Sequence, residues 1–133
     1  MLQFTKEVDY GIQLISALTK SKSGELLSLR NFSKDSKISF LFLQRIAKKL
    51  REAKIVKSVK GAQGGYQLNN EFKNLTIKNI VEALEGEYAV TNCLKKGCHC
   101  TKEGKCDSQK VFKMVNEKLV KYLGELKLSE VIN

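Results

Sequence analysis

Apolar residues recur every three to four positions in five stretches of the chain, which is the spacing of helices that bury one face. The first stretch, residues 5–20, has apolar residues on more than one side and predicts a largely buried helix. A shorter amphipathic helix is predicted over 27–35, with Ser28 as its N-cap. After a turn, Ser39 is expected to cap a stronger helix over 40–53. Its inward positions are Phe40, Leu43, Ile46, Ala47 and Leu50.

Between residues 55 and 68 the pattern changes from helical to alternating. The segment 55–59 is rich in β-branched residues, and the segment 66–68 follows a glycine-rich stretch over 60–65. This combination predicts two short strands joined by a turn, a β-hairpin. A further helix is predicted over 77–85, with Thr76 as its N-cap.

The last predicted helix opens at Ser108, extends to about residue 126 and carries one continuous apolar stripe. A long helix with one such stripe needs a surface on which to pack. The stripe supports two surfaces about equally, the chain's own domain and the same helix of a second copy. We expect dimerisation through its residues, which are Val111, Met114, Val115, Leu119, Tyr122, Leu123 and Leu126.

The order of helix, short helix, basic helix and hairpin is typical of a winged helix-turn-helix. The predicted fold is therefore mainly α with a small two-stranded β-wing and a long C-terminal dimerisation helix. The expected division is a DNA-binding domain over 1–86, a cysteine loop over 87–107, and a dimerisation helix and tail over 108–133.

Positive charge is concentrated in the predicted DNA-binding part. The chain of 133 residues has a formal net charge of +10. Residues 1–80 hold 15 Lys and Arg against 6 Asp and Glu, whereas residues 81–133 hold 9 against 8. Such asymmetry favours a polyanionic partner, most simply double-stranded DNA. The alternative is an ordinary solvated surface of a lysine-rich protein.

The helix over 40–53 is expected to enter the major groove, which is about as wide as an α-helix. Gln44 and Arg45 are predicted to read base edges, because both side chains form paired hydrogen bonds with bases. Neighbouring cations are better placed for phosphates, which position the protein without specifying sequence. These cations are Lys48, Lys49 and Arg51.

Leu41 and Phe42 lie outside the buried stripe of the same helix. They are expected either to contact thymine methyl groups or to pack against the first helix. The hairpin tip is predicted to approach a groove or the DNA backbone closely, because glycine has no Cβ in the way. The remaining predicted DNA contacts are Ser28, Ser39, Lys60, Gly61, Gln63 and Gly64.

Several other classes of protein lack support. No apolar run approaches the roughly 18 residues that span a membrane, and the charged N-terminus is unlike a signal peptide; we therefore expect a cytoplasmic protein. The hairpin tip lacks the order of a nucleotide-binding P-loop. No Ser/His/Asp set, H-E-x-x-H motif or spaced carboxylate pair indicates an enzyme.

Four cysteines lie within fourteen residues, and the rest of the chain has none. They are Cys93, Cys98, Cys100 and Cys106, and the only histidine, His99, lies among them. In a cytoplasmic protein such a cluster more often binds metal or reacts than forms structural disulfides. Three chemistries stay open: an iron–sulfur cluster, a structural zinc site with or without His99, and a cluster-free thiol redox switch.

Motifs along nearly the whole chain resemble the iron–sulfur winged-helix regulators typified by the IscR and NsrR transcription factors. The motifs that carry the resemblance are Phe4-Thr5, Asp9-Tyr10-Gly11, Phe42-Leu43-Gln44-x-Ile46-x-x-x-Leu50, the wing over 58–68, and Ile77-x-x-Ile80-Val81-x-Ala83-Leu84-Glu85-Gly86. The resemblance implies a homodimer in which the C-terminal helix crosses to the partner. It also implies that three cysteines hold a cluster whose state changes operator affinity, and we expect a repressor.

The fourth cluster ligand differs between the two branches of that family. The IscR-like branch has a histidine three residues after the last cysteine, where this chain has Gln109. The NsrR-like branch has an aspartate in the first helix of the other subunit, and Asp9 matches that position. The resemblance is therefore closer to the NsrR-like branch, which favours a 4Fe–4S over a 2Fe–2S cluster and nitric oxide as the signal. The alternative role of Asp9 is an ordinary first-turn carboxylate that complements the helix dipole.

The loop departs from the family pattern because it has four cysteines where three are typical. Cys93 and Cys106 are the natural outer ligands. The spacing to Cys106 favours Cys100 as the middle ligand, although Cys98 stays possible. If both bind, four thiolates complete the site without Asp9.

Overall fold

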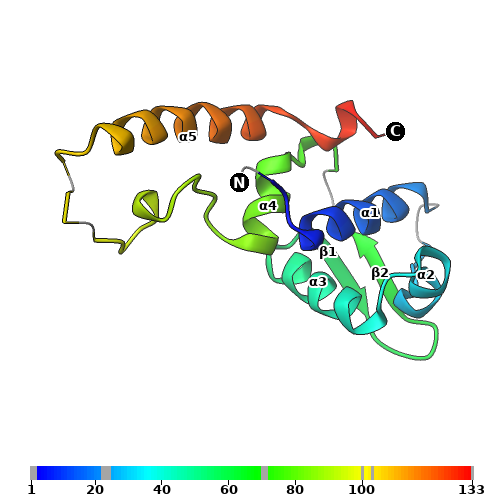
Figure 1. The fold of residues 1–133 in the computed structure, drawn as a ribbon. Coiled ribbons are helices and arrows are strands. Elements are labelled where there is room, and N and C mark those ends of the chain that lie inside the picture. Colours follow the sequence, from blue (N-terminus) through cyan, green and yellow to red (C-terminus); the bar gives the residue numbers. More distant parts are fainter. Residues whose placement is uncertain (1–2, 22–24, 70–71, 100, 103, 133) are drawn as a thin grey trace.

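The computed structural model describes residues 3–21, 25–69, 72–99, 101–102 and 104–132 (Figure 1). A bundle of helices carries a two-stranded antiparallel sheet on one side, and a long helix runs across the other. This arrangement confirms the predicted fold class. In chain order the elements are α1 (Lys6–Lys20), α2 (Leu29–Ser36), α3 (Phe40–Glu52), β1 (Val56–Val59), β2 (Gly65–Leu68), the 3-10 turn η1 (Phe72–Asn74), α4 (Ile77–Glu85), η2 (Asn92–Leu94), α5 (Asp107–Glu125) and η3 (Leu128–Glu130).

Capping explains most of the helix starts. Ser28 accepts a hydrogen bond from the Asn31 amide at the start of α2, and Thr76 forms a capping box with Asn79 at the start of α4. These bonds satisfy amides that have no partner within the helix.

Two predicted helix starts differ from the structure. Ser39 precedes α3 but its hydroxyl makes no capping bond; its carbonyl accepts from the Leu43 amide at 3.0 Å, so the helix begins there without the side chain. The last helix begins before Ser108, because the Cys106 carbonyl already accepts from the Lys110 amide at 3.3 Å.

The hydrophobic core lies where α1, α3 and α4 meet. Gly11 of α1 permits their close approach, since a Cβ there would lie 2.5 Å from Leu84 Cδ1 of α4. The completely buried side chains include Val8, Leu14, Ile15, Leu43, Ile46, Leu50, Ile80 and Val81.

The hairpin is tied to the bundle by a pairing that the sequence analysis missed. β1 and β2 pair with Val56 opposite Leu68 and Val59 opposite Gly65. Leu27 then adds a single bridge to the other edge of β2: it donates to the Tyr66 carbonyl at 2.8 Å and accepts from the Tyr66 amide at 2.9 Å. Leu27 is therefore extended, and α2 begins later than predicted.

The C-terminal end of the chain packs on the DNA-binding bundle. Leu123 and Leu128 are buried, the Ile77 amide donates to the Leu126 carbonyl at 3.0 Å, and the Leu128 amide donates to the Leu75 carbonyl at 2.9 Å. Leu123 and Leu126 are both predicted as dimerisation residues. Leu123 lies in this chain's own core, and Leu126, which follows the end of α5, is partly buried against that core.

The N-terminal half of α5 extends beyond α4, together with the cysteine loop (Figure 1). Here the apolar stripe is uncovered: Val111 is 59% and Met114 is 62% exposed. Leu119 is half-buried, and Val115 and Tyr122 are exposed. Within the described residues, no helix has the length and apolar content needed to cross a membrane.

Candidate DNA-binding surface and cysteine loop

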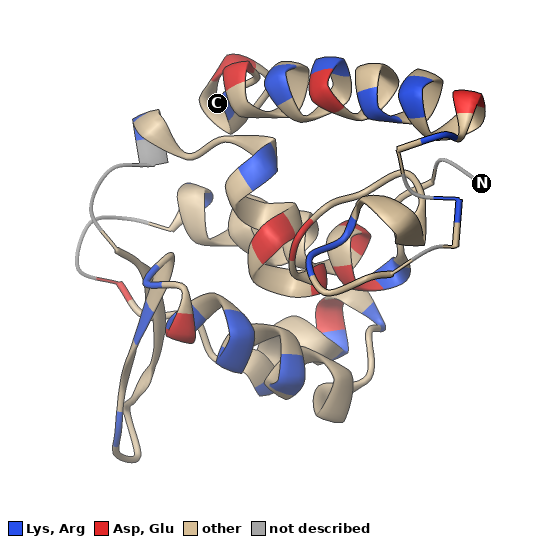
Figure 2. Ribbon diagram, turned by 90° about the vertical axis from the view of Figure 1, so that its left-hand side faces the viewer, with Lys and Arg blue, Asp and Glu red and all other residues tan. Residues whose placement is uncertain are grey.

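The exposed face of α3 carries the predicted base-reading side chains. Gln44, Arg45 and Lys48 are all exposed, while the opposite face of the helix enters the core. Leu41 is 73% exposed near the start of the helix. In Figure 2, Lys and Arg occur along α3 and on the hairpin that projects beside it, which gives this side of the molecule its positive charge.

Phe42 packs against the first helix, which is the second of the two roles expected for it. Its ring lies edge-on to the Tyr10 ring, with centroids 5.3 Å apart and an angle of 80° between the planes. The Arg45 guanidinium lies 5.4 Å from the centre of the Phe42 ring. Leu41 and Phe42 therefore have different surroundings, although they are adjacent in sequence.

Glu7 of α1 joins the first helix to the recognition helix. Its Oε1 accepts from Arg45 Nη2 at 2.8 Å and its Oε2 accepts from Lys49 Nζ at 2.9 Å. The Lys49 ammonium also donates to the Leu84 carbonyl of α4 at 3.1 Å. The hydrogen bond from Lys49 lowers the pKa of the Glu7 carboxyl below its usual value; burial opposes this effect, and the charges of Lys49 and Arg45 add to it.

Sequence reasoning missed Glu7 because its partners lie 38 and 42 residues away along the chain. Only the packing of α1 on α3 brings them together. An acidic residue in the first turn of a helix has a sufficient local explanation in the helix dipole, so no sequence signal indicated a second role.

Lys48 and Lys49 are both predicted to contact phosphates, and the structure gives them different surroundings. Replacing the exposed Lys48 with Ala should weaken binding to all DNA sequences and reduce the slope of log affinity against log salt by about 1. Lys49→Ala should instead lower the unfolding temperature, because it removes a partner from Glu7. Salt-dependent fluorescence anisotropy and thermal unfolding measure the two effects. Equal salt slopes in the two variants would contradict this assignment.

The wing tip is formed by residues 60–64, between the two strands. Gly61 has a φ of +118°, which is unfavourable for residues with a Cβ. Its carbonyl accepts from the Gly64 amide at 3.0 Å and closes the turn. Lys60, just before this turn, and Gln63, within it, are both exposed. Ser28, by contrast, is half-buried, and its hydroxyl caps α2.

The cysteine loop joins α4 to α5, and a residue near the start of the loop is hydrogen-bonded to the middle of α5. The Val90 amide donates to Asn116 Oδ1 at 2.8 Å, and the Thr91 hydroxyl lies 3.1 Å from Cys93 Sγ. Cys93, Cys98 and Cys106 are half-buried free thiols, and Cys100 lies outside the described residues.

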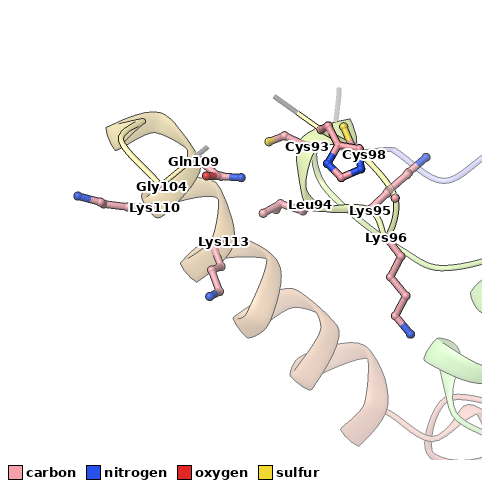
Figure 3. A pocket seen from close by; sticks show the side chains of 11 residues that line it. Cys93, Leu94, Lys95, Lys96, Cys98, Gly104, Gln109, Lys110 and Lys113 are labelled. Atoms are coloured by element: carbon pink, nitrogen blue, oxygen red, sulfur yellow. The ribbon is translucent and has the colours of Figure 1, made fainter. Parts of the chain in front are cut away.

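Cys93 lies between two hollows in this region. One is lined by Cys93 together with Cys98, His99 and Gln109, and by several lysines (Figure 3). The other is lined by Cys93, Cys106 and Phe112. Gln109 points from α5 toward Cys93. The lysines of the first hollow are Lys95, Lys96, Lys110 and Lys113.

The three thiols suit iron–sulfur and zinc chemistry alike. The described residues of one chain do not bring three or more Cys, His, Asp or Glu side chains together around a point that would hold a metal. Asp9 is exposed on α1, where its Oδ1 accepts from Gln13 Nε2 at 3.0 Å. The donor chemistry therefore fits a cluster, and the ligand set stays a prediction.

A winged helix-turn-helix with a basic recognition helix and a long C-terminal helix is the architecture of a DNA-binding transcription regulator. The comparisons agree. The chain belongs to the Rrf2 family, described as an iron-dependent transcriptional regulator, whose family model matches residues 4–133.

Individual relatives support this assignment. The HTH-type transcriptional regulator IscR of Klebsiella pneumoniae (strain 342) is 25% identical over 133 residues, covering 99% of this chain and 80% of that protein. The structure of T. potens IscR has a TM-score of 0.73 at 26% identity, covering 98% of this chain and 85% of that one. CymR, the global cysteine regulator of B. subtilis, shares the fold with a TM-score of 0.78 at 23% identity, covering 98% and 96%.

Proposed function

We propose that this regulator binds its operator as a homodimer and that an iron–sulfur cluster in the cysteine loop controls operator affinity. The observation that carries the proposal is the position of Cys93. It lines one hollow with Cys98 and a second with Cys106, so the same side chain borders two hollows that each contain a second cysteine of the loop. IscR relatives in the same family support a cluster as the group held there.

Cys93 and Cys106 would be the outer ligands, with Cys98 or Cys100 between them. Asp9 of the partner subunit would supply the fourth ligand, which favours a 4Fe–4S cluster and nitric oxide as the signal. Gln109, which lines the same hollow as Cys93, is a poor ligand and fits this choice better than an IscR-like site. The four lysines around the hollow would offset the negative charge of a thiolate-bound cluster.

The loop begins where α4 contacts both α1 and α3. Glu85, the last residue of α4, accepts hydrogen bonds at Oε1 from the Thr5 amide, at 3.2 Å, and from the Thr5 hydroxyl. The preceding residue, Leu84, accepts from Lys49 of the recognition helix at 3.1 Å. A change in the loop would therefore act on the two helices that set the geometry of the DNA-binding surface. Because half-sites are spaced by the DNA helical repeat, affinity depends on the angle between the two DNA-binding units.

The test is to measure iron, sulfide and visible absorption of protein purified without oxygen. We expect about four iron and four sulfide ions per chain, the content of one cubane cluster, and a visible absorption that nitric oxide bleaches. Cys93→Ala should abolish the cluster, whereas Ser108→Ala, an exposed residue of the same region, should retain it. Comparing Cys98→Ala with Cys100→Ala identifies the middle ligand, and Asp9→Ala tests the fourth.

Gel shifts with cluster-loaded and cluster-free protein then test control of DNA binding. Equal operator affinity in the two states would reject the proposal. Stoichiometric zinc, with unfolding on chelation, would favour the structural zinc site instead. Free thiols without iron or zinc would favour the redox switch.

A further inference from the structure

We infer that Glu7 is a positioning residue for sequence recognition, because it holds the Arg45 guanidinium in the orientation in which Arg45 meets the major groove. The inference uses the family's DNA binding and the predicted contact between Arg45 and a base. It does not require the iron–sulfur proposal, because none of the residues involved belongs to the cysteine loop; the two have in common only the bond from Lys49 to the Leu84 carbonyl.

Contacts other than the one with Arg45 hold the Glu7 carboxylate in place. It lies in the first turn of α1 and its side chain is only 17% exposed. One oxygen accepts from Lys49 Nζ at 2.9 Å, and the same ammonium donates to the Leu84 carbonyl at 3.1 Å. Bonds from α3 and to α4 therefore set the position of the carboxylate, and its second oxygen is directed at Arg45.

The Arg45 guanidinium is held by Glu7 at one nitrogen, and its other edges are exposed to solvent. Its side chain is 65% exposed, with Nη2 on Glu7 at 2.8 Å and the guanidinium near the Phe42 ring. A guanidinium carries five N–H donors, and Glu7 occupies one nitrogen, so other donors face solvent. Arginine recognises guanine through two parallel hydrogen bonds to O6 and N7, which require a defined orientation of the guanidinium plane. Arg45 held in this way would lose little side-chain entropy on binding.

Stability alone is a weak reason for this arrangement. Ion pairs with an exposed partner contribute little to folding, because solvent screens them and ordering the side chain opposes them. Arg45 is such a partner, whereas one oxygen of the Glu7 carboxylate already accepts from the less exposed Lys49. The bond to Arg45 thus affects mainly the orientation of a side chain on the recognition surface.

The experiment selects preferred sequences from a randomised duplex DNA pool with the full-length wild-type protein, Glu7→Gln, Arg45→Ala and the double variant. We expect wild-type protein to prefer guanine at one position in each half-site and Arg45→Ala to lose that preference. Glu7→Gln should weaken discrimination at the same position roughly 2- to 10-fold. In the Arg45→Ala background it should have no further effect, which shows that Glu7 acts through Arg45.

Glu52→Gln is the matched control, because it removes the same charge from an exposed position at the end of α3. It should leave the base preference unchanged, and thermal unfolding should show that every variant is folded. Uniformly weaker binding by Glu7→Gln with unchanged base preference would overturn the inference. Stronger discrimination by Glu7→Gln would also overturn it, because Glu7 would then hold Arg45 away from DNA. Unchanged preferences in Arg45→Ala would reject the Arg45 contact itself, and the inference with it. If the wild-type protein selected no sequence at all, the assumption of sequence-specific DNA binding would be wrong, and the inference would fall with it.

Discussion

Gly64→Ala should lower operator affinity roughly tenfold or more while the helical bundle stays folded. A Cβ at this position would lie 2.1 Å from the Val59 carbonyl oxygen and 3.0 Å from that of Gly61. Both are backbone atoms, so the clash cannot be relieved by a side-chain rotation. The wing tip must therefore change shape, and the predicted DNA contacts Lys60 and Gln63 would move with it.

Fluorescence anisotropy with operator DNA measures this loss, and circular dichroism during heating checks the fold. Ala62→Ser is the control, because Ala62 is exposed at the same tip and a hydroxyl there meets no packed surface. It should bind as wild-type protein does. Wild-type affinity in Gly64→Ala would show that the shape of the wing tip has no part in DNA binding. Unfolding of the whole protein would show that the stability of the helical bundle depends on the wing tip.

Met114→Lys should convert the expected homodimer into monomers and strongly weaken operator binding. Met114 is 62% exposed on the overhanging half of α5, beside Val111 and Val115. An interface on this face would bury the new ammonium without a partner, which costs several kcal/mol. In the proposed homodimer two linked subunits would bind two half-sites, so a monomer would also lose the gain in affinity from binding both at once.

Analytical ultracentrifugation gives the oligomeric state, and anisotropy gives the DNA affinity. Glu117→Gln is the matched control: it makes the formal charge more positive by one unit at an exposed polar position on the same helix. It should remain dimeric. A dimer of unchanged stability in Met114→Lys would place the interface elsewhere.

Local patterns were sufficient to predict most of the elements. The apolar spacing of α1, α3 and α4 and the glycine-rich turn of the hairpin act over a few residues, and the observed bounds lie close to those predicted. The start of α2 was less accurate, because Leu27 pairs with Tyr66 of a distant strand. Such a bridge depends on how the hairpin folds back on the bundle, which periodicity does not encode.

The apolar stripe of the last helix likewise shows what local patterns predict and what packing decides. Its spacing predicted the helix, but spacing cannot say which partner covers each residue. Packing assigns Leu123 to the chain's own core and leaves Met114 exposed, because only the C-terminal half of α5 lies over α4.

The sequence by itself determined that this chain forms a basic winged helix-turn-helix and carries a cluster of thiols, because both features follow from residues that are near one another along the chain. Only the tertiary structure decided that Phe42 packs on Tyr10, that Cys93 lines one hollow with Cys98 and another with Cys106, and that Glu7 meets Arg45 and Lys49. The reason is physical. Contacts between distant segments depend on the relative placement of whole helices, which the burial of the common core sets.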